Sequence, residues 1–376
     1  MLKKIVILLI IVLCILAGLF GYGLHAAKDP DVLADAVYQC KPQRVNLLIT
    51  LGADVRKSLP EVHVTSPDKE QAEDCIEVTR LLLDAGAEVD AQNTLGDTLL
   101  VEAIDYQNIE LAKLLIQAGA DVNVVDHSNN ILLMNALRRD SPELLKLLID
   151  AGVDVNKRTG EIEGFPWDIP IFQLINVFDD NEKYIDQNRK KAKLLIDAGA
   201  DINRLYESKL EDETQTFLMN LVCRYRAFYD PLASLNILIE LGADVNITNN
   251  NGKTALMFAV ENYEPNLAII RALLDAGTDA SIIDKDGKNA LFYALNNPKI
   301  DKSITNLLLD AGASVNQRNQ NGITPLMIAS WEGRTDLIQP LLDLGADVNA
   351  KTNDGKTVLD ERMIRIRDML KAAGAL

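Results

Sequence analysis

The sequence predicts an all-α solenoid of helix-turn-helix units with short β-hairpin fingers, preceded by one N-terminal hydrophobic helix. A leucine-rich phrase that ends in Gly-Ala-Asp-Val-Asn, or in a close variant, recurs ten times along the 376 residues. Its glycines are Gly52, Gly86, Gly119, Gly152, Gly199, Gly242, Gly277, Gly312, Gly345 and Gly374. Most of their spacings are 33 to 35 residues, which indicates a stack of similar units with one extended surface.

The N-terminal segment, residues 1–28, is predicted to direct the chain to a membrane. Lys3 and Lys4 precede residues 5–24, which carry no charge. This stretch exceeds the ~7–15 residues of a usual signal-peptide core and approaches the ~20 that cross a bilayer. We therefore favour an uncleaved anchor, with a cleaved signal peptide and a secreted or periplasmic product as the alternative. In both cases the two lysines stay in the cytoplasm and the repeats lie on the extracytoplasmic side. The leader is similar to bacterial ones, in which that side is the periplasm.

Residues 251–280 show how one unit is built. Asn251-Gly252 predicts a tight turn, and Thr254 then opens a short apolar helix. Pro265 ends that helix because it cannot donate the backbone hydrogen bond that a helix requires. A second helix follows and ends at Gly277, where we expect a left-handed backbone. Two short helices cannot bury their apolar faces by themselves, so each unit must stack on its neighbours.

This pattern resembles the ankyrin-repeat family over residues 29–376. The family's Thr-Pro-Leu-His-x-Ala motif is closest at residues 324–329 (TPLMIA) and looser at residues 254–259 (TALMFA). Methionine or phenylalanine stands near the place of the usual histidine, and we expect these side chains to pack there: Met134, Met219, Met257, Phe292 and Met327. The resemblance implies a non-catalytic protein-protein interaction scaffold that binds through the concave face formed by fingers and first helices.

Two long glycine spacings indicate insertions in the repeats at residues 153–242. The extra residues fall at 157–168, 179–188 and 204–215, in hairpins or between helices. Insertions in repeat arrays map to loops on one face, often the binding face. Aromatic side chains are concentrated in the same region, and large rings are frequent interface anchors. We predict partner contacts from five of them, while packing of the insertions onto the stack remains the alternative: Phe165, Trp167, Tyr206, Phe228 and Tyr229.

The two ends of the stack depart from the pattern. Residues 65–74 (TSPDKEQAED) occupy the place of the second repeat's first helix but are nearly all polar, so we expect a short solvated helix or loop. Residues 350–376 are short and rich in arginine and lysine, which is typical of a polar C-terminal capping repeat.

Cys40 and Cys75 fall near the inter-helix turns of the first two repeats. Equivalent positions in neighbouring repeats are expected roughly 10 Å apart, which is wide for a disulfide. We therefore favour free thiols, with a disulfide in an oxidising compartment as the alternative.

Composition limits the possible functions. A net charge of −17 argues against nucleic-acid binding. The repeated aspartate of the phrase explains this acidity, and selection for a basic partner is the alternative. The three histidines (His25, His63 and His127) are scattered, and we find no phosphate loop, metal spacing or cofactor motif. We therefore expect a monomeric protein-binding scaffold that is not an enzyme. The competing hypotheses are an envelope spacer without a single high-affinity partner and an exported effector or toxin-neutralising protein.

Overall fold

The computed structural model describes residues 28–62, 69–128, 130–139, 141–157, 169–175, 182–208, 213–224, 230–359 and 364–374. The chain divides into two compact units, residues 1–161 and residues 162–376. The hydrophobic leader expected at residues 1–28 lies almost wholly outside the described residues. No helix in the described part of the chain is long and apolar enough to cross a membrane.

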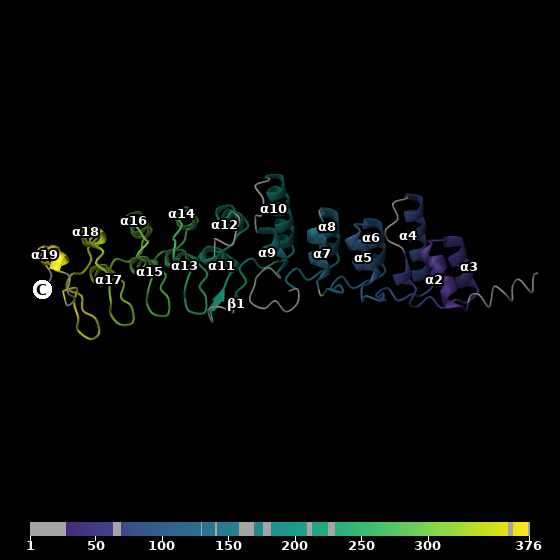
Figure 1. Cartoon of the computed structure of the whole chain (residues 1–376), viewed down its shortest axis with the longest axis horizontal. Coiled ribbons are helices and arrows are strands. Elements are labelled where there is room, and N and C mark those ends of the chain that lie inside the picture. Colours follow the sequence, from purple (N-terminus) through teal and green to yellow (C-terminus); the bar gives the residue numbers. More distant parts are fainter. Residues whose placement is uncertain are drawn as a thin grey trace, which may run out of the picture. The chain divides into compact units, whose positions relative to one another are not determined.

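The first unit is built from antiparallel helix pairs joined by short loops (Figure 1). Its elements are α2 (Pro30–Tyr38), α3 (Pro42–Thr50), η1 (Leu59–Glu61), α4 (Lys69–Asp84), α5 (Leu99–Asp105), α6 (Ile109–Gln117), α7 (Leu132–Arg138) and α8 (Pro142–Asp150). The first helix of each pair contacts the first helix of the next pair, as α5 contacts α7. The second helices contact one another in the same way, as α6 contacts α8.

The second unit repeats the same arrangement. Its elements are α9 (Pro170–Ile175), α10 (Glu182–Asp197), β1 (Tyr206–Ser208), β2 (Glu213–Gln215), α11 (Phe217–Cys223), α12 (Pro231–Glu240), α13 (Ala255–Glu261), α14 (Leu267–Asp275), α15 (Ala290–Asn296), α16 (Lys302–Asp310), α17 (Pro325–Trp331), α18 (Thr335–Asp343) and α19 (Ile364–Ala372). In Figure 1, α11, α13, α15 and α17 form one row and α12, α14, α16 and α18 form another. The core lies between these two rows.

Most of the short first helices begin at a side chain that caps them, although α7 follows Ile131, which does not. The Thr254 hydroxyl accepts a hydrogen bond from the N–H of Met257, and Thr324 does the same for Met327. Such a cap satisfies one of the N–H groups that the first turn of a helix leaves unpaired. The residues expected near the family's histidine position are all buried, which confirms their packing role: Met134, Met219, Met257, Phe292 and Met327.

The recurring Gly-Ala-Asp-Val-Asn phrase is explained by local hydrogen bonds. Its ten glycines have φ between +83° and +94° and end the second helices, as expected. At Gly345 the glycine N–H donates to the carbonyl of Leu342, and the N–H of Ala346 donates to that of Leu341. These two bonds satisfy carbonyls at the helix end, so the phrase is a helix stop signal.

The aspartate and asparagine of the phrase hold neighbouring repeats together. Asp244 accepts a hydrogen bond from the N–H of Asn246 at 2.8 Å, and Asn246 accepts one from the N–H of Asp279 in the next repeat, also at 2.8 Å. The Asn246 amide also donates to the carbonyl of Gly277 at 3.2 Å. The same inter-repeat bond links Asn316 to Asp347. The aspartates of the phrase therefore have a structural role, as Asp347 again shows by accepting from the N–H of Asn349.

Most of the described fingers are tight loops, two of them carry an isolated antiparallel bridge (Gln92 with Thr98 and Val125 with Ile131), and residues 206–215 form a strand pair. There β1 and β2 pair antiparallel, with Tyr206 opposite Gln215. In a typical finger the N–H of Asn249 donates to the carbonyl of Lys253, while the Asn249 side chain accepts from the N–H groups of Asn251 and Lys253. This side chain closes the turn, and no strand ladder is needed. The expectation of β-hairpin fingers is thus confirmed at the second insertion and, as single bridges, in the fingers at residues 92–98 and 125–131.

Two second helices are longer than the sequence analysis expected. α4 and α10 each contain 16 residues, whereas α14 contains 9. Residues 69–74, expected as a separate polar element, are the first turns of α4. Residues 182–188 of the first insertion likewise begin α10.

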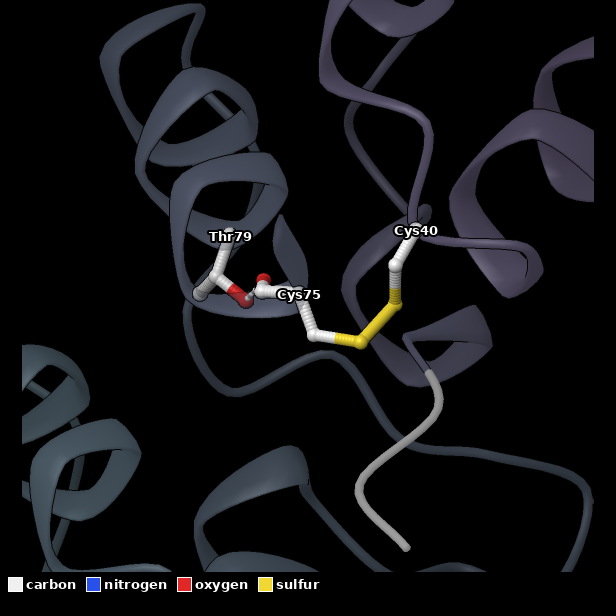
Figure 2. Close-up of a disulfide and its surroundings, with 3 residues drawn as sticks. All are labelled: Cys40, Cys75 and Thr79. Carbon is white, nitrogen blue, oxygen red and sulfur yellow. Dashed lines mark hydrogen bonds between the residues drawn. A yellow bond between two sulfur atoms is a disulfide. The ribbon is translucent and has the colours of Figure 1, made fainter. Parts of the chain in front are cut away.

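Cys40 and Cys75 form a disulfide, which corrects the preference for free thiols (Figure 2). Their Cα atoms are 4.7 Å apart. The two cysteines do not occupy equivalent positions, because Cys75 lies inside the elongated α4 while Cys40 lies in the turn after α2 with φ of +50°. The spacing expected for equivalent helix positions therefore does not apply.

Candidate functional site

The surface on which the fingers meet the first helices carries side chains that the repeat does not require for its own fold. We call this surface in residues 213–331 the inner face. In each repeat it contains the residue just before the helix cap and the fourth residue after the cap. Lys253 and Phe258 occupy these positions around Thr254, and Lys288 and Tyr293 occupy them around Asn289. The repeat period therefore places chemically similar groups side by side.

Lys253 joins side chains of three successive repeats on the inner face. Its Nζ is 3.0 Å from a carboxylate oxygen of Glu261 and 3.8 Å from one of Glu213. The same ammonium lies 5.3 Å from the centroid of the Phe258 ring and 5.0 Å from that of Tyr293. Ring faces and carboxylates both stabilise a cation, so the lysine is held in one place with only 16% of its side chain exposed.

The electrostatics of the inner face follow from this packing. Burial opposes the charge of Lys253, but the hydrogen bond with Glu261 and the nearby carboxylates outweigh it and raise the pKa of the lysine. The hydroxyl of Tyr293 donates a short hydrogen bond to Asp284. Burial and this carboxylate raise the pKa of Tyr293. Lys253 is therefore charged and Tyr293 neutral at physiological pH.

Glu213 connects this cluster to the neighbouring finger. The amide of Asn249 donates to one of its carboxylate oxygens at 3.1 Å, and the amide of Asn251 donates to the other at 2.9 Å. Thr214 and Asn250 exchange a further pair of hydrogen bonds, each 2.9 Å long. The strand pair formed by the second insertion is thus fixed to the next repeat and forms one wall of the site.

An asparagine after α13 and another after α15 bind the preceding repeat. The amide of Asn262 donates to the carbonyl of Cys223 at 2.8 Å, at the end of the preceding first helix. One repeat later, the Asn297 amide donates to the carbonyls of Val260 and Asn262 at 2.9 and 2.8 Å. Each asparagine therefore caps the helix before it and holds α11, α13 and α15 in register.

These groups enclose an open cleft of about 550 Å³, which we call the Lys253 cleft. Its lining residues are Glu213, Cys223, Lys253, Phe258, Glu261, Asn262 and Tyr263. Tyr263 is 73% exposed at its edge, and the ammonium of Lys299 lies 4.5 Å from the Tyr263 ring centroid. In the part of the chain that the structure describes, no group of three His, Cys, Asp or Glu residues is placed to hold a metal ion. The cleft offers rings, ion pairs and amides, which are the groups that recognise another protein.

Of the five aromatic residues predicted to contact a partner, Tyr206 is the one that the structure describes. It is 6% exposed, and its hydroxyl donates to the carbonyl of Thr216 at 3.3 Å. Tyr206 therefore packs the strand pair onto α11, which is the alternative that the sequence left open, and it offers little surface to a partner. Phe165, Trp167, Phe228 and Tyr229 lie outside the described residues, and their contacts with a partner stay predictions.

The comparison with protein families agrees with this architecture. The family model described as ankyrin repeats (3 copies) matches residues 70–159, 184–284, 224–319 and 263–352, which together make up more than half of the chain. The chain belongs to the ankyrin-repeat family. Ankyrin repeats indicate a protein-protein interaction scaffold. No curated protein matches the chain.

The residues of the Lys253 cleft were not predicted from the sequence, because most of them lie outside the aromatic-rich insertions. The signal that would have found them is the register of the repeats. Lys253 and Lys288 each precede a helix cap, and Phe258 and Tyr293 follow it at the same distance. Alignment of the ankyrin repeats on their caps therefore identifies the inner face, whereas aromatic content does not.

Proposed function

We propose that the chain is a non-catalytic protein-protein interaction scaffold whose repeats lie on the extracytoplasmic side of a membrane. The observation that carries the scaffold role is the Lys253 cleft, where side chains from two successive repeats line one open surface. Its walls are held by the Glu213 and Asn262 hydrogen bonds, so the surface is preorganised. A preorganised surface loses less conformational entropy when a partner binds.

The membrane location has two sources of support. Lys3, Lys4 and the uncharged residues 5–24 have the order of a membrane-targeting segment, with the positive charges on the cytoplasmic side. The Cys40–Cys75 disulfide is of a kind that persists in oxidising compartments. The mass of the mature protein distinguishes the two versions of this proposal, because loss of the first ~23–27 residues would show a cleaved signal peptide instead of an anchor. Digestion of the repeats by protease added to the cytoplasmic side of membrane vesicles would overturn the location itself.

We further propose that the chain acts as a monomer and that its partner is a protein of basic character. A net charge of −17 accelerates the encounter with a basic protein and disfavours nucleic acid. Light scattering of the full chain in detergent measures the oligomeric state directly.

Capture of a partner by the full chain tests the scaffold role. We expect the double variant Tyr263→Ala/Lys299→Ala to reduce capture at least about tenfold, because tyrosine is enriched among the residues that dominate interface energies and Lys299 lies against its ring. Leu344→Ala is the matched control, since Leu344 is 55% exposed at the end of α18, away from the Lys253 cleft. The variant Phe165→Ala/Trp167→Ala tests the inserted loop in the same assay. If none of these proteins retains a partner, the spacer hypothesis replaces the scaffold.

A further inference from the structure

A second cleft, in the first unit, has features that the Lys253 cleft does not share. It encloses about 540 Å³ between the end of α2, η1, the finger at residues 93–97 and the end of α5. We call it the Tyr106 cleft. Three large side chains on its rim are more than half exposed: Tyr38 (58%), Leu95 (67%) and Tyr106 (59%). They come from three different elements, so their convergence depends on the stack.

Exposed rings and aliphatic groups that gather around a cavity are typical of an interaction site. Water surrounds these groups in the free protein, and a partner that covers them gains the free energy of burying apolar surface. The Tyr106 side chain, which is 59% exposed, is also an aromatic ring, and the faces of such rings attract cations.

Most of the ionisable groups that line the cleft are carboxylates. Its charged lining residues are Glu61, Asp97, Glu102, Asp105, His127 and Arg139. Arg139 lies 3.3 Å from Asp105, and the Nδ1 of His127 lies 2.8 Å from Asp97. Four carboxylates thus face one guanidinium and one imidazole, which leaves the cleft negative and favours a cationic occupant.

Neighbouring groups orient these carboxylates. Asp97 accepts a second hydrogen bond, from the backbone N–H of His127 at 2.7 Å, and the amide of Asn93 donates to Glu102 at 2.8 Å. Carboxylates held in fixed positions beside ring faces match a guanidinium, which is planar, stacks on rings and pairs with carboxylates through two parallel hydrogen bonds. A lysine ammonium would satisfy the charge but not the planar geometry.

The disulfide holds one wall of the Tyr106 cleft. Cys40 follows Tyr38 by two residues and is bonded to Cys75 in α4, on which α3 also packs (Figure 2). Both cysteines are buried, at 0% and 4% exposure. The covalent link therefore restricts the position of the Tyr38 ring relative to the second repeat.

We propose that the Tyr106 cleft binds an arginine side chain displayed by a segment of the partner protein, and that the Cys40–Cys75 disulfide keeps the cleft in its binding geometry. This inference rests on the proposed scaffold function and specifies the chemistry of the partner. It adds a binding site in the first unit to the one on the inner face of the second.

Defined peptides test the chemistry of the site. The probes are three fluorescent peptides, Gly-Leu-Xaa-Leu-Gly with blocked ends, in which Xaa is arginine, lysine or citrulline, the uncharged analogue of arginine. Binding to the full chain in detergent micelles is measured by fluorescence anisotropy. We expect the arginine peptide to bind most tightly, the lysine peptide more weakly and the citrulline peptide at least about tenfold more weakly than arginine. Equal binding of arginine and citrulline peptides would overturn the proposal.

Matched variants locate the binding. Tyr106→Ala and Leu95→Ala remove exposed side chains, so both proteins should fold, and each should weaken the arginine peptide about tenfold. Leu344→Ala is the control, because Leu344 is 55% exposed, lies in the second unit and lines neither cleft. Reduction of the disulfide should also weaken binding without any change of lining residue. Unchanged affinity in both Tyr106→Ala and Leu95→Ala would refute the site.

Photo-crosslinking distinguishes this proposal from the scaffold function. Benzoylphenylalanine is introduced in place of Leu95 or of Tyr263 in the full chain, and the captured partner is mapped by mass spectrometry. A crosslink from position 95 to a partner segment that contains arginine supports the cleft. Crosslinks from position 263 together with none from position 95 would overturn the cleft while the scaffold function stands. If no partner is captured and no peptide binds, both proposals fail.

Discussion

Replacement of Asn297 tests how neighbouring repeats are held together. Its amide donates to the carbonyl of Val260 at 2.9 Å and to that of Asn262 at 2.8 Å, and its side-chain oxygen accepts from the N–H of Lys299 at 3.0 Å. The side chain is only 8% exposed, so water cannot readily take its place. Asn297→Ala leaves two carbonyls of the preceding repeat without these donors.

The expected cost follows from those two carbonyls. A buried polar group left without its hydrogen bond costs about 1–3 kcal/mol. Val260 is fully buried and Asn262 is partly exposed, so the full penalty applies to the first carbonyl and a reduced one to the second. We expect Asn297→Ala to lower the free energy of unfolding by about 2–3 kcal/mol.

Asn296→Ala provides the control, because the two asparagines are adjacent and chemically identical. Asn296 is exposed, and its amide donates within its own helix to the carbonyl of Phe292 at 3.0 Å. Alanine favours a helix more than asparagine does, by about 0.5 kcal/mol, which offsets the lost bond. We expect this variant to change stability by less than about 0.5 kcal/mol.

Urea unfolding followed by circular dichroism measures both variants. Repeat arrays can unfold in parts, so hydrogen exchange must locate the change. We expect Asn297→Ala to reduce protection at residues 255–262 and 290–297. Equal effects of the two variants, or a loss of protection away from these helices, would refute the inter-repeat role of Asn297.

Three further predictions concern the disulfide, the glycines and His127. Cys75→Ala should destabilise the first unit by about 3–4 kcal/mol, because the disulfide closes a separation of 35 residues, and thermal unfolding with and without reductant measures this. Gly277→Ala should lower the free energy of unfolding by about 1–2 kcal/mol, because its φ of +87° is unfavourable for alanine. Gly252→Ala should lower it further in the same unfolding assay, because the added Cβ would also lie 3.0 Å from the backbone of the next finger. The hydrogen bond and charge of Asp97 raise the pKa of His127, so an NMR titration should show it above its ordinary value, and Asp97→Asn should lower it. Any stabilisation from this contact is complete below the ordinary pKa and is lost as the pH rises through the raised one.

Different results would contradict each of these. A wild-type protein whose unfolding is insensitive to reductant would exclude a stabilising disulfide. Equal costs at Gly252 and Gly277 would show that the close approach between fingers is absent. An unchanged His127 titration in Asp97→Asn would show that the two side chains do not pair.

Much of the fold was predictable because its signals are local. The cap at Thr254, the break before Asn266 and the stop at Gly277 each depend on hydrogen bonds between residues at most five apart. Such bonds form in the same way in every repeat, so a recurring phrase is enough to recognise them. Two features were harder to predict. The side chain of Asn249 closes its turn without a strand ladder, and such closure leaves no apolar pattern in the sequence. The extension of α4 runs through polar residues and leaves none either.

The binding surface was harder to predict because its parts are far apart in the sequence. Lys253 contacts Glu213 and lies over the ring of Tyr293, each about one repeat away. The aromatic content of the insertions suggested Tyr206 instead, and that residue is buried beneath the strand pair. Proximity between repeats depends on how the stack aligns, which aromatic content does not reveal.

The sequence by itself determined the repeat period, the helix ends and the family, because these depend on short-range bonds that each phrase contains. Only the tertiary structure decided that Cys40 and Cys75 are joined, which aspartates serve the fold, and which side chains share the Lys253 and Tyr106 clefts. Those features require groups from different repeats to meet. Their distances are set by the stacking of helices, a long-range property that no single phrase encodes.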